Sequence, residues 1–308
     1  MEKRLTRTEM LFSLGFLFML VFAVGAFFYG VKMGSDKTEA KFIEQTKHLS
    51  SGNVKNATAY QQQDLVSFYH TVFLPYREFQ AEWFQTFSKM STGQLSDPAS
   101  ALKELTSLAN QKYAAAGSSS FPASSPLLGQ SQVEIMKSLK LFSKAASRGA
   151  GSAKSMEVTE LIDALNQDAY YVEGVKQAMA GQQNYYSAML KWSSSIDPNI
   201  PDHYEAQSVL QINSWKSLSL TIKNKLMADQ LNARKQFASY FPQDLTSRVD
   251  EFINSGQASK MKMKTVDSIV DLLISTQAVR SGDFTSSKAK LYADELLPQL
   301  PFFYTEQK

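Results

Sequence analysis

Cysteine is absent from this chain of 308 residues, and histidine occurs only three times. Without cysteine there are no disulfides, no thiolate nucleophiles, no zinc fingers and no iron–sulfur clusters. An excess of charge of one sign is also missing, because 32 Lys and Arg face 29 Asp and Glu. This balance gives no electrostatic reason to expect nucleic acid as a partner.

Sequence signatures of catalysis are missing as well. None of the three histidines belongs to a Glu-x-x-His or His-Glu-x-x-His motif, and there is no Gly-x-Ser-x-Gly elbow. Residues 149–155 resemble a phosphate-binding loop, but Ala153 replaces the required glycine. The acidic residues Glu157, Glu160 and Asp163 follow a helix start, where they complement the helix dipole. We predict that the protein is not an enzyme and binds no cofactor or metal.

Long hydrophobic runs are limited to one, residues 11–30, which carry no charge. Twenty helical residues span about 30 Å, the thickness of a bilayer core, so we predict a single transmembrane helix. Lys3, Arg4 and Arg7 precede it and place the N-terminus in the cytoplasm. The alternative is a signal peptide cleaved near residues 23–26, but the run is longer than such peptides usually have.

Small residues with a spacing of four lie at the end of this run and just beyond it: Ala26, Gly30 and Gly34. Such residues share one helix face and allow two helices to approach closely, so they form a candidate homodimer face. In the alternative interpretation, Gly30 and Gly34 only loosen the helix as it leaves the bilayer.

Alternating apolar and polar residues, the signature of a half-buried strand, form no run long enough for a sheet. The sequence instead predicts an all-α protein, with the transmembrane helix followed by an extracytoplasmic antiparallel helical bundle. Whether there is one bundle or two in series is left open. The predicted organisation is a cytoplasmic tail (1–10), the transmembrane helix (11–30), a stalk (31–57), a first helical subdomain (58–147), a flexible linker (148–155) and a second helical subdomain (156–308).

Helical periodicity is strongest over residues 58–91, where Pro75 predicts a kink near Leu74. Asp97 and Pro98 predict the start of the next helix. A loop is expected over 117–129. The further helices are expected at 130–147, 156–194, 203–238, 243–254, 258–280 and 285–297, and the apolar tail 300–304 is expected to pack onto the bundle.

Aromatic residues of the 58–91 helix cover more than one face, and the surplus, including Phe73, Tyr76 and Phe84, is a candidate groove for a partner helix or an apolar ligand. Burial by neighbouring helices is the simpler interpretation. The basic run 260–264 is a candidate contact for anionic lipid or wall polymer, or else a solvated helix start.

These patterns favour a non-enzymatic, membrane-anchored interaction or scaffold module of the cell envelope, with an envelope protein as partner and most of the chain outside the cytoplasm. Two alternatives are a protein that binds a lipid or small molecule between its helices, and a ligand-sensing ectodomain that signals through a separate membrane partner.

Overall fold

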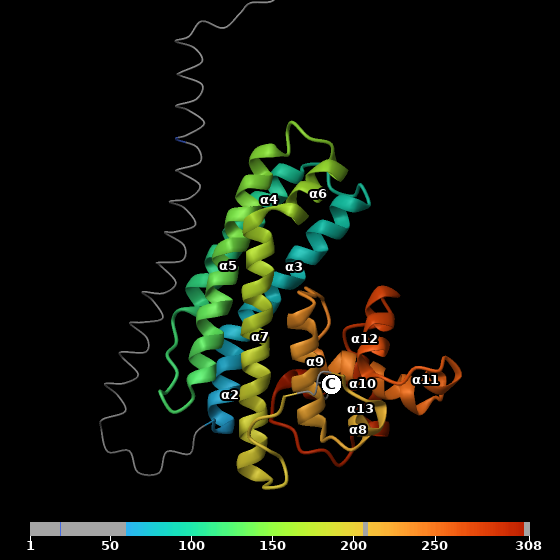
Figure 1. The fold of residues 1–308 in the computed structure, drawn as a ribbon. Helices are drawn as coiled ribbons and strands as arrows, with labels where there is room; N and C mark the ends of the chain where they lie inside the picture. The colour runs from blue at the N-terminus through green and yellow to red at the C-terminus, as the bar shows by residue number, and fades with distance from the viewer. Residues whose placement is uncertain (1–18, 20–59, 206–208, 305–308) are drawn as a thin grey trace, which may run out of the picture. The chain divides into compact units, whose positions relative to one another are not determined.

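The computed structural model describes residues 60–205 and 209–304, together with Met19. Within these residues the secondary structure is helical, apart from one antiparallel β-bridge between Gln211 and Thr265 (Figure 1). The predicted all-α class is therefore confirmed for this part of the chain. Residues Thr58–Lys308 form one compact unit.

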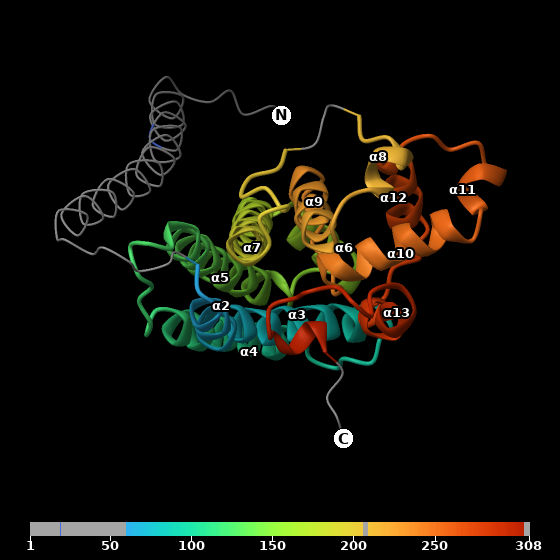
Figure 2. The same cartoon turned by 90° about the horizontal axis from the view of Figure 1, so that it is seen from below.

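The described residues of this unit form α-helices that pack against one another. They are α2 (Gln62–Phe68), α3 (Leu74–Ser91), α4 (Pro98–Ala116), α5 (Pro126–Ser152), α6 (Val158–Gln167), α7 (Ala169–Ile196), α8 (Ile212–Lys216), α9 (Leu220–Ala233), α10 (Pro242–Asn254), α11 (Gln257–Lys260), α12 (Val266–Ser275) and α13 (Asp283–Leu291). Contacts connect α3 to α4, α4 to α5, α5 to α7, α7 to α9, α9 to α10 and α10 to α13. Figure 2 shows this order, with α8 and α10 to α13 gathered beyond α9.

The closest helix pair, α5 and α7, depends on a glycine. The Ser131 hydroxyl of α5 donates to the Gly181 carbonyl of α7 at 2.6 Å. A Cβ atom at Gly181 would lie 2.8 Å from Cγ1 of Ile135, closer than real Cβ atoms approach. Gly181 therefore allows close packing in the middle of an unbroken 28-residue helix.

Pro75 lies inside a helix that continues through it, as predicted. The turn before it, Tyr69–Phe73, is π-helical, and the Leu74 N–H donates to the Tyr69 carbonyl five residues earlier. Proline has no N–H to offer the carbonyl four residues before it, and its ring collides with that carbonyl in a regular α-helix. The wider π turn relieves this conflict at the position where the kink was expected.

The predicted linker 148–155 is wrong, because α5 continues to Ser152. Gly149 is buried inside the helix, where an added Cβ would lie 2.7 Å from Leu165 and 3.2 Å from Leu102. A glycine-rich stretch is helical here because small residues let α4 and α6 approach α5. Since α5 and α7 come from the two predicted subdomains and pack along each other, the division into 58–147 and 156–308 is also wrong.

Other boundaries also differ from the prediction. The loop expected at 117–129 ends at Ser125, and the helix expected at 156–194 is split at Asp168, whose carboxylate caps α7 by accepting the Tyr170 N–H at 2.8 Å. The expected helix 203–238 comprises the separate helices α8 and α9, and 258–280 comprises α11 and α12. Helix α10 lies within one residue of its predicted bounds, whereas α13 begins two residues and ends six residues before the predicted bounds 285–297.

The C-terminal tail packs onto the bundle, as predicted. Leu300 and Phe303 are buried, with 0% and 1% of their surface exposed, and residues Pro301–Phe303 form a short 3-10 helix. The Phe302 ring stacks on Phe241, with 5.0 Å between centroids. The tail thus joins the aromatic core over the N-terminal end of α10.

A buried carboxylate, that of Asp244, ties the start of α10 to the start of α13. It accepts backbone N–H groups from Phe241 at 2.8 Å, Phe284 at 3.0 Å and Gly282 at 3.2 Å. Burial raises the pKa of this carboxyl to about 6, although the N–H donors favour the charged form.

This raised pKa predicts a pH dependence of stability. Because the folded state holds the Asp244 proton more tightly than the unfolded chain, whose pKa is near 3.8, the contribution is complete below that value and is lost as the pH rises through about 6. As the pH rises across this window, the loss of this contribution lowers the free energy of unfolding by up to about 3 kcal/mol. Urea unfolding at several pH values, compared with Asp244→Asn, measures it, and an identical pH slope in the variant would contradict the assignment.

Candidate docking site

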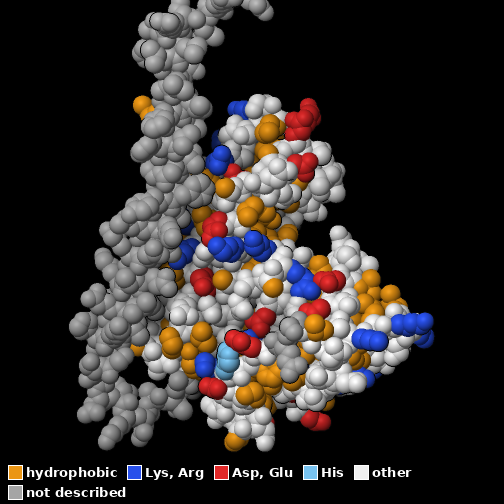
Figure 3. Space-filling view, in the orientation of Figure 1, with side chains coloured by type: hydrophobic (Ala, Val, Ile, Leu, Met, Phe, Trp, Pro, Cys, Tyr) orange, Lys and Arg blue, Asp and Glu red, His pale blue; other side chains and the backbone are white. Residues whose placement is uncertain are grey.

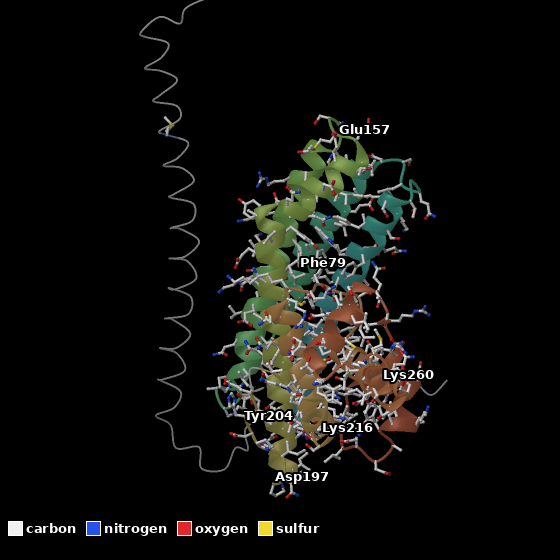
Figure 4. The ribbon with its side chains drawn as sticks, turned by 45° about the vertical axis from the view of Figure 1, so that its right-hand side comes forward. Phe79, Glu157, Asp197, Tyr204, Lys216 and Lys260 are labelled. Atoms are coloured by element: carbon white, nitrogen blue, oxygen red, sulfur yellow. The ribbon has the colours of Figure 1, made fainter. Side chains whose placement is uncertain are left out.

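The predicted aromatic groove does not exist as an open surface. Phe73 and Tyr76 have no exposed surface. The Phe73 ring lies against Phe241 and Phe302, which come from the second half of the chain, and Phe84 packs on Phe237 with 5.0 Å between centroids. Phe73 and Tyr76 are therefore part of the aromatic core, as the simpler interpretation had it, whereas Phe84 is half-buried beside Phe237. Phe79, on the same helix, lies among the packed helices in Figure 4.

Other residues singled out in the sequence form no site in the described structure. His70 and His203 are exposed, and His203 lies 3.3 Å from Glu205. The exposed acidic residues Glu157, Glu160 and Asp163 lie at or near the start of α6. The described residues contain no group of three side chains able to hold a metal ion.

Four predicted features lie outside the described residues, with the exception of Met19. They are the tail 1–10, the transmembrane helix 11–30, the stalk 31–57 and the dimer face Ala26, Gly30 and Gly34. Among the described helices, none combines the length and apolar composition that a membrane span requires.

The basic run forms a turn that the fold holds firmly. Helix α11 ends at Lys260, and residues 260–264, which we call the lysine turn, reverse the chain before α12. Lys262 has a φ of 56°, and the N–H of Met263 donates to the Ala258 carbonyl at 2.9 Å. The carbonyl of Lys264 accepts the Ile212 N–H at 3.2 Å. The second of these bonds attaches the lysine turn to the first residue of α8.

Beside the lysine turn lies an open pocket of about 350 Å³, which we call the basic pocket. Its walls come from α8 with the residue before it, the end of α10, α11 and the lysine turn. The lining residues are Gln211, Ile212, Asn213, Lys216, Ile253, Ala258, Ser259, Met263 and Lys264. The pocket thus has aliphatic side chains beside two lysines, two side-chain amides and one hydroxyl.

Two lysines, Lys216 and Lys264, line the basic pocket, and Lys260 and Lys262 precede Lys264 on the lysine turn. All four are exposed, and none of them forms an ion pair with another described residue. Figure 4 places Lys216 and Lys260 in the same part of the unit, and Figure 3 shows basic and hydrophobic side chains together near α11. Met261 adds an apolar side chain that is 55% exposed.

A buried carboxylate fixes the α8 side of the pocket. Asp250 of α10 accepts the Trp215 indole N–H at 2.6 Å, the Tyr292 hydroxyl at 2.6 Å and the Lys223 ammonium at 3.1 Å. Trp215 is fully buried and lies one residue before Lys216. The short helix α8 is therefore anchored by its tryptophan, which positions Lys216 on the pocket rim.

The pocket offers cations and aliphatic carbon to a ligand, and its lining includes no carboxylate or imidazole. The basic run 260–264 is evident in the sequence but the pocket is not, because Lys216 and Ile253 come from α8 and α10, and no periodicity links these positions. Comparisons with protein-family models, with curated proteins and with solved structures gave no match.

Proposed function

We propose that the protein is a non-enzymatic interaction module of the cell envelope that docks a partner protein at the basic pocket. The observation that carries the proposal is the pocket itself: an apolar floor beside four lysines that no described carboxylate neutralises. A concave site with apolar side chains and unpaired cations is suited to a ligand of opposite charge.

In this proposal residues 11–30 span the membrane once, with the N-terminus in the cytoplasm and the helical unit 58–308 outside it. The support is the charge-free length of the run and the basic residues before it. Ala26, Gly30 and Gly34 would then bring two anchors together as a homodimer. A scaffold of this kind acts by holding its partner at the membrane surface.

Native mass spectrometry on the full-length protein, gently extracted from its own membranes, tests the proposal. We expect a co-purifying protein at fixed stoichiometry, and we expect the double variant Lys216→Glu/Lys264→Glu to lose it. The matched control is Lys103→Glu/Lys154→Glu, which changes the net charge equally at two exposed lysines of other elements. A bound lipid or small molecule in place of a protein, or a bare protein from crosslinked cells, would contradict the proposal.

A further inference from the structure

We infer that the basic pocket receives a short acidic segment of the partner protein, which inserts one apolar side chain and places its carboxylates on the surrounding lysines. This inference rests on the proposed function and names the chemistry of the partner. Three features of the pocket carry it: its aliphatic floor, its uncompensated charge and its concave shape.

The floor provides the apolar contact. Ile253 and Ala258 are 7% and 3% exposed, and Ile212 and Met263 are half-buried beside them. A volume of about 350 Å³ is at the lower end of the range for ligand pockets, so it suits one or two aliphatic or aromatic side chains. Methionine adapts its shape to different guests because its side chain is unbranched and flexible.

The charge around the pocket suits an acidic guest, because the carboxylates of α10 and α12 have other partners. Asp250 is held by Lys223, Trp215 and Tyr292. Asp267 accepts the Gln230 amide at 2.8 Å and the Leu210 N–H at 3.4 Å.

On the α10 side, Glu251 pairs with Arg248 at 2.6 Å and accepts the Ser287 hydroxyl. Since none of these carboxylates is within ion-pair distance of the four lysines, a guest with glutamates or aspartates supplies the missing counter-charge.

The shape favours a peptide over a lipid surface. A flat bilayer can reach the protruding Met261, but it cannot reach Ile253 and Ala258 at the bottom of the pocket. A peptide side chain can enter, and the side chains of Gln211, Asn213 and Ser259 line the pocket where its backbone would pass. Amide and hydroxyl groups at these positions are able to hydrogen-bond a peptide backbone.

The test uses the full-length protein in nanodiscs of neutral phosphatidylcholine and a fluorescein-labelled peptide in which two leucines are flanked on both sides by glutamates. Fluorescence anisotropy measures its Kd. We expect Lys216→Glu/Lys264→Glu to weaken binding about tenfold or more, and the control Lys103→Glu/Lys154→Glu to change it less than about twofold. Ser259→Trp should weaken binding comparably by filling the pocket without changing its charge. High salt should weaken binding in the wild type.

Two further peptides separate the contributions of charge and apolar contact. A peptide with lysines in place of the glutamates should not bind, and one with serines in place of the leucines should bind at least about tenfold more weakly. Equal binding of the serine peptide, or an unchanged Kd in the Lys216→Glu/Lys264→Glu variant, would overturn the inference. Binding to vesicles that contain phosphatidylglycerol, without binding to the acidic peptide, would overturn it in favour of a lipid surface. If the acidic peptide fails while native mass spectrometry retains a pocket-dependent protein partner, the proposed function stands and only the chemistry assigned to the partner is wrong.

Discussion

Replacing Asp250 by alanine is expected to lower the free energy of unfolding by about 3–5 kcal/mol. The substitution leaves the Lys223 ammonium, whose side chain is only 12% exposed, without its carboxylate. It also removes the acceptor of the Trp215 indole N–H and of the Tyr292 hydroxyl, both of which come from buried residues. Each buried donor left without a partner costs a further desolvation penalty of about 1–3 kcal/mol, part of which relaxation and entering water recover.

The conservative variant Asp250→Asn separates the two contributions. It keeps an oxygen that can accept the indole N–H but removes the charge that Lys223 needs, so its loss of stability should be smaller than that of the alanine variant. Urea unfolding followed by tryptophan fluorescence measures both, because Trp83, Trp192 and Trp215 are all buried. A loss below about 1 kcal/mol in Asp250→Ala would show that the network is not a stabilising unit.

The Asp250→Ala substitution should also weaken docking at the basic pocket. Trp215 holds α8 against α10, and Lys216 follows it directly. When the indole loses its acceptor, α8 is free to shift and Lys216 no longer has a fixed place on the rim. We therefore expect weaker binding of the acidic peptide to Asp250→Ala, even at temperatures where that variant is folded, and a smaller effect in Asp250→Asn, which keeps an acceptor for the indole N–H.

Helix ends show what the sequence could and could not predict. Helices α3 and α10 were placed nearly correctly, and both are followed by a glycine with positive φ, Gly93 at 68° and Gly256 at 77°. Glycine adopts this conformation without a steric penalty, which makes it a readable stop signal. Asp97 and Pro98 were equally readable at the start of α4, where the Asp97 carboxylate accepts the Ser100 N–H at 3.1 Å.

Three other helices end in the same way but without glycine. Lys235 after α9, Lys262 after α11 and Gln277 after α12 have φ values of 51°, 56° and 52°. In each case the N–H of the next residue returns to a carbonyl five residues back, at 2.9 Å, which is the hydrogen bond of a helix C-cap. Lysine and glutamine are ordinary helix formers, and tertiary packing offsets the strain of their left-handed conformation. This is why 258–280 was read as one helix instead of two.

The prediction of an aromatic groove was wrong for a different reason. Periodicity correctly showed that the 58–91 helix carries more aromatic residues than one face can hold, but it cannot show what covers the surplus. The cover comes from Phe237, Phe241 and Phe302, more than 150 residues along the chain from Phe73 and Phe84. Contacts at such separation leave no local pattern.

Replacing Phe303 by alanine should cost about 3–5 kcal/mol, the second large loss that we predict. Its ring is 1% exposed and lies against Phe284 and Phe302, with centroids 5.7 Å and 4.6 Å away. Truncation leaves a cavity between the tail and α13, and the tail has few other buried groups with which to close it.

The matched control is Leu296→Ala in the same tail. Leu296 is 54% exposed, so its truncation should change the free energy of unfolding by less than about 0.5 kcal/mol. Urea unfolding of the two variants under the same conditions measures both losses of free energy of unfolding. Equally small losses of free energy of unfolding in both variants would mean that the tail adds little to the fold. A large loss confined to Phe303→Ala would mean that residues Pro301–Phe303 close the aromatic core.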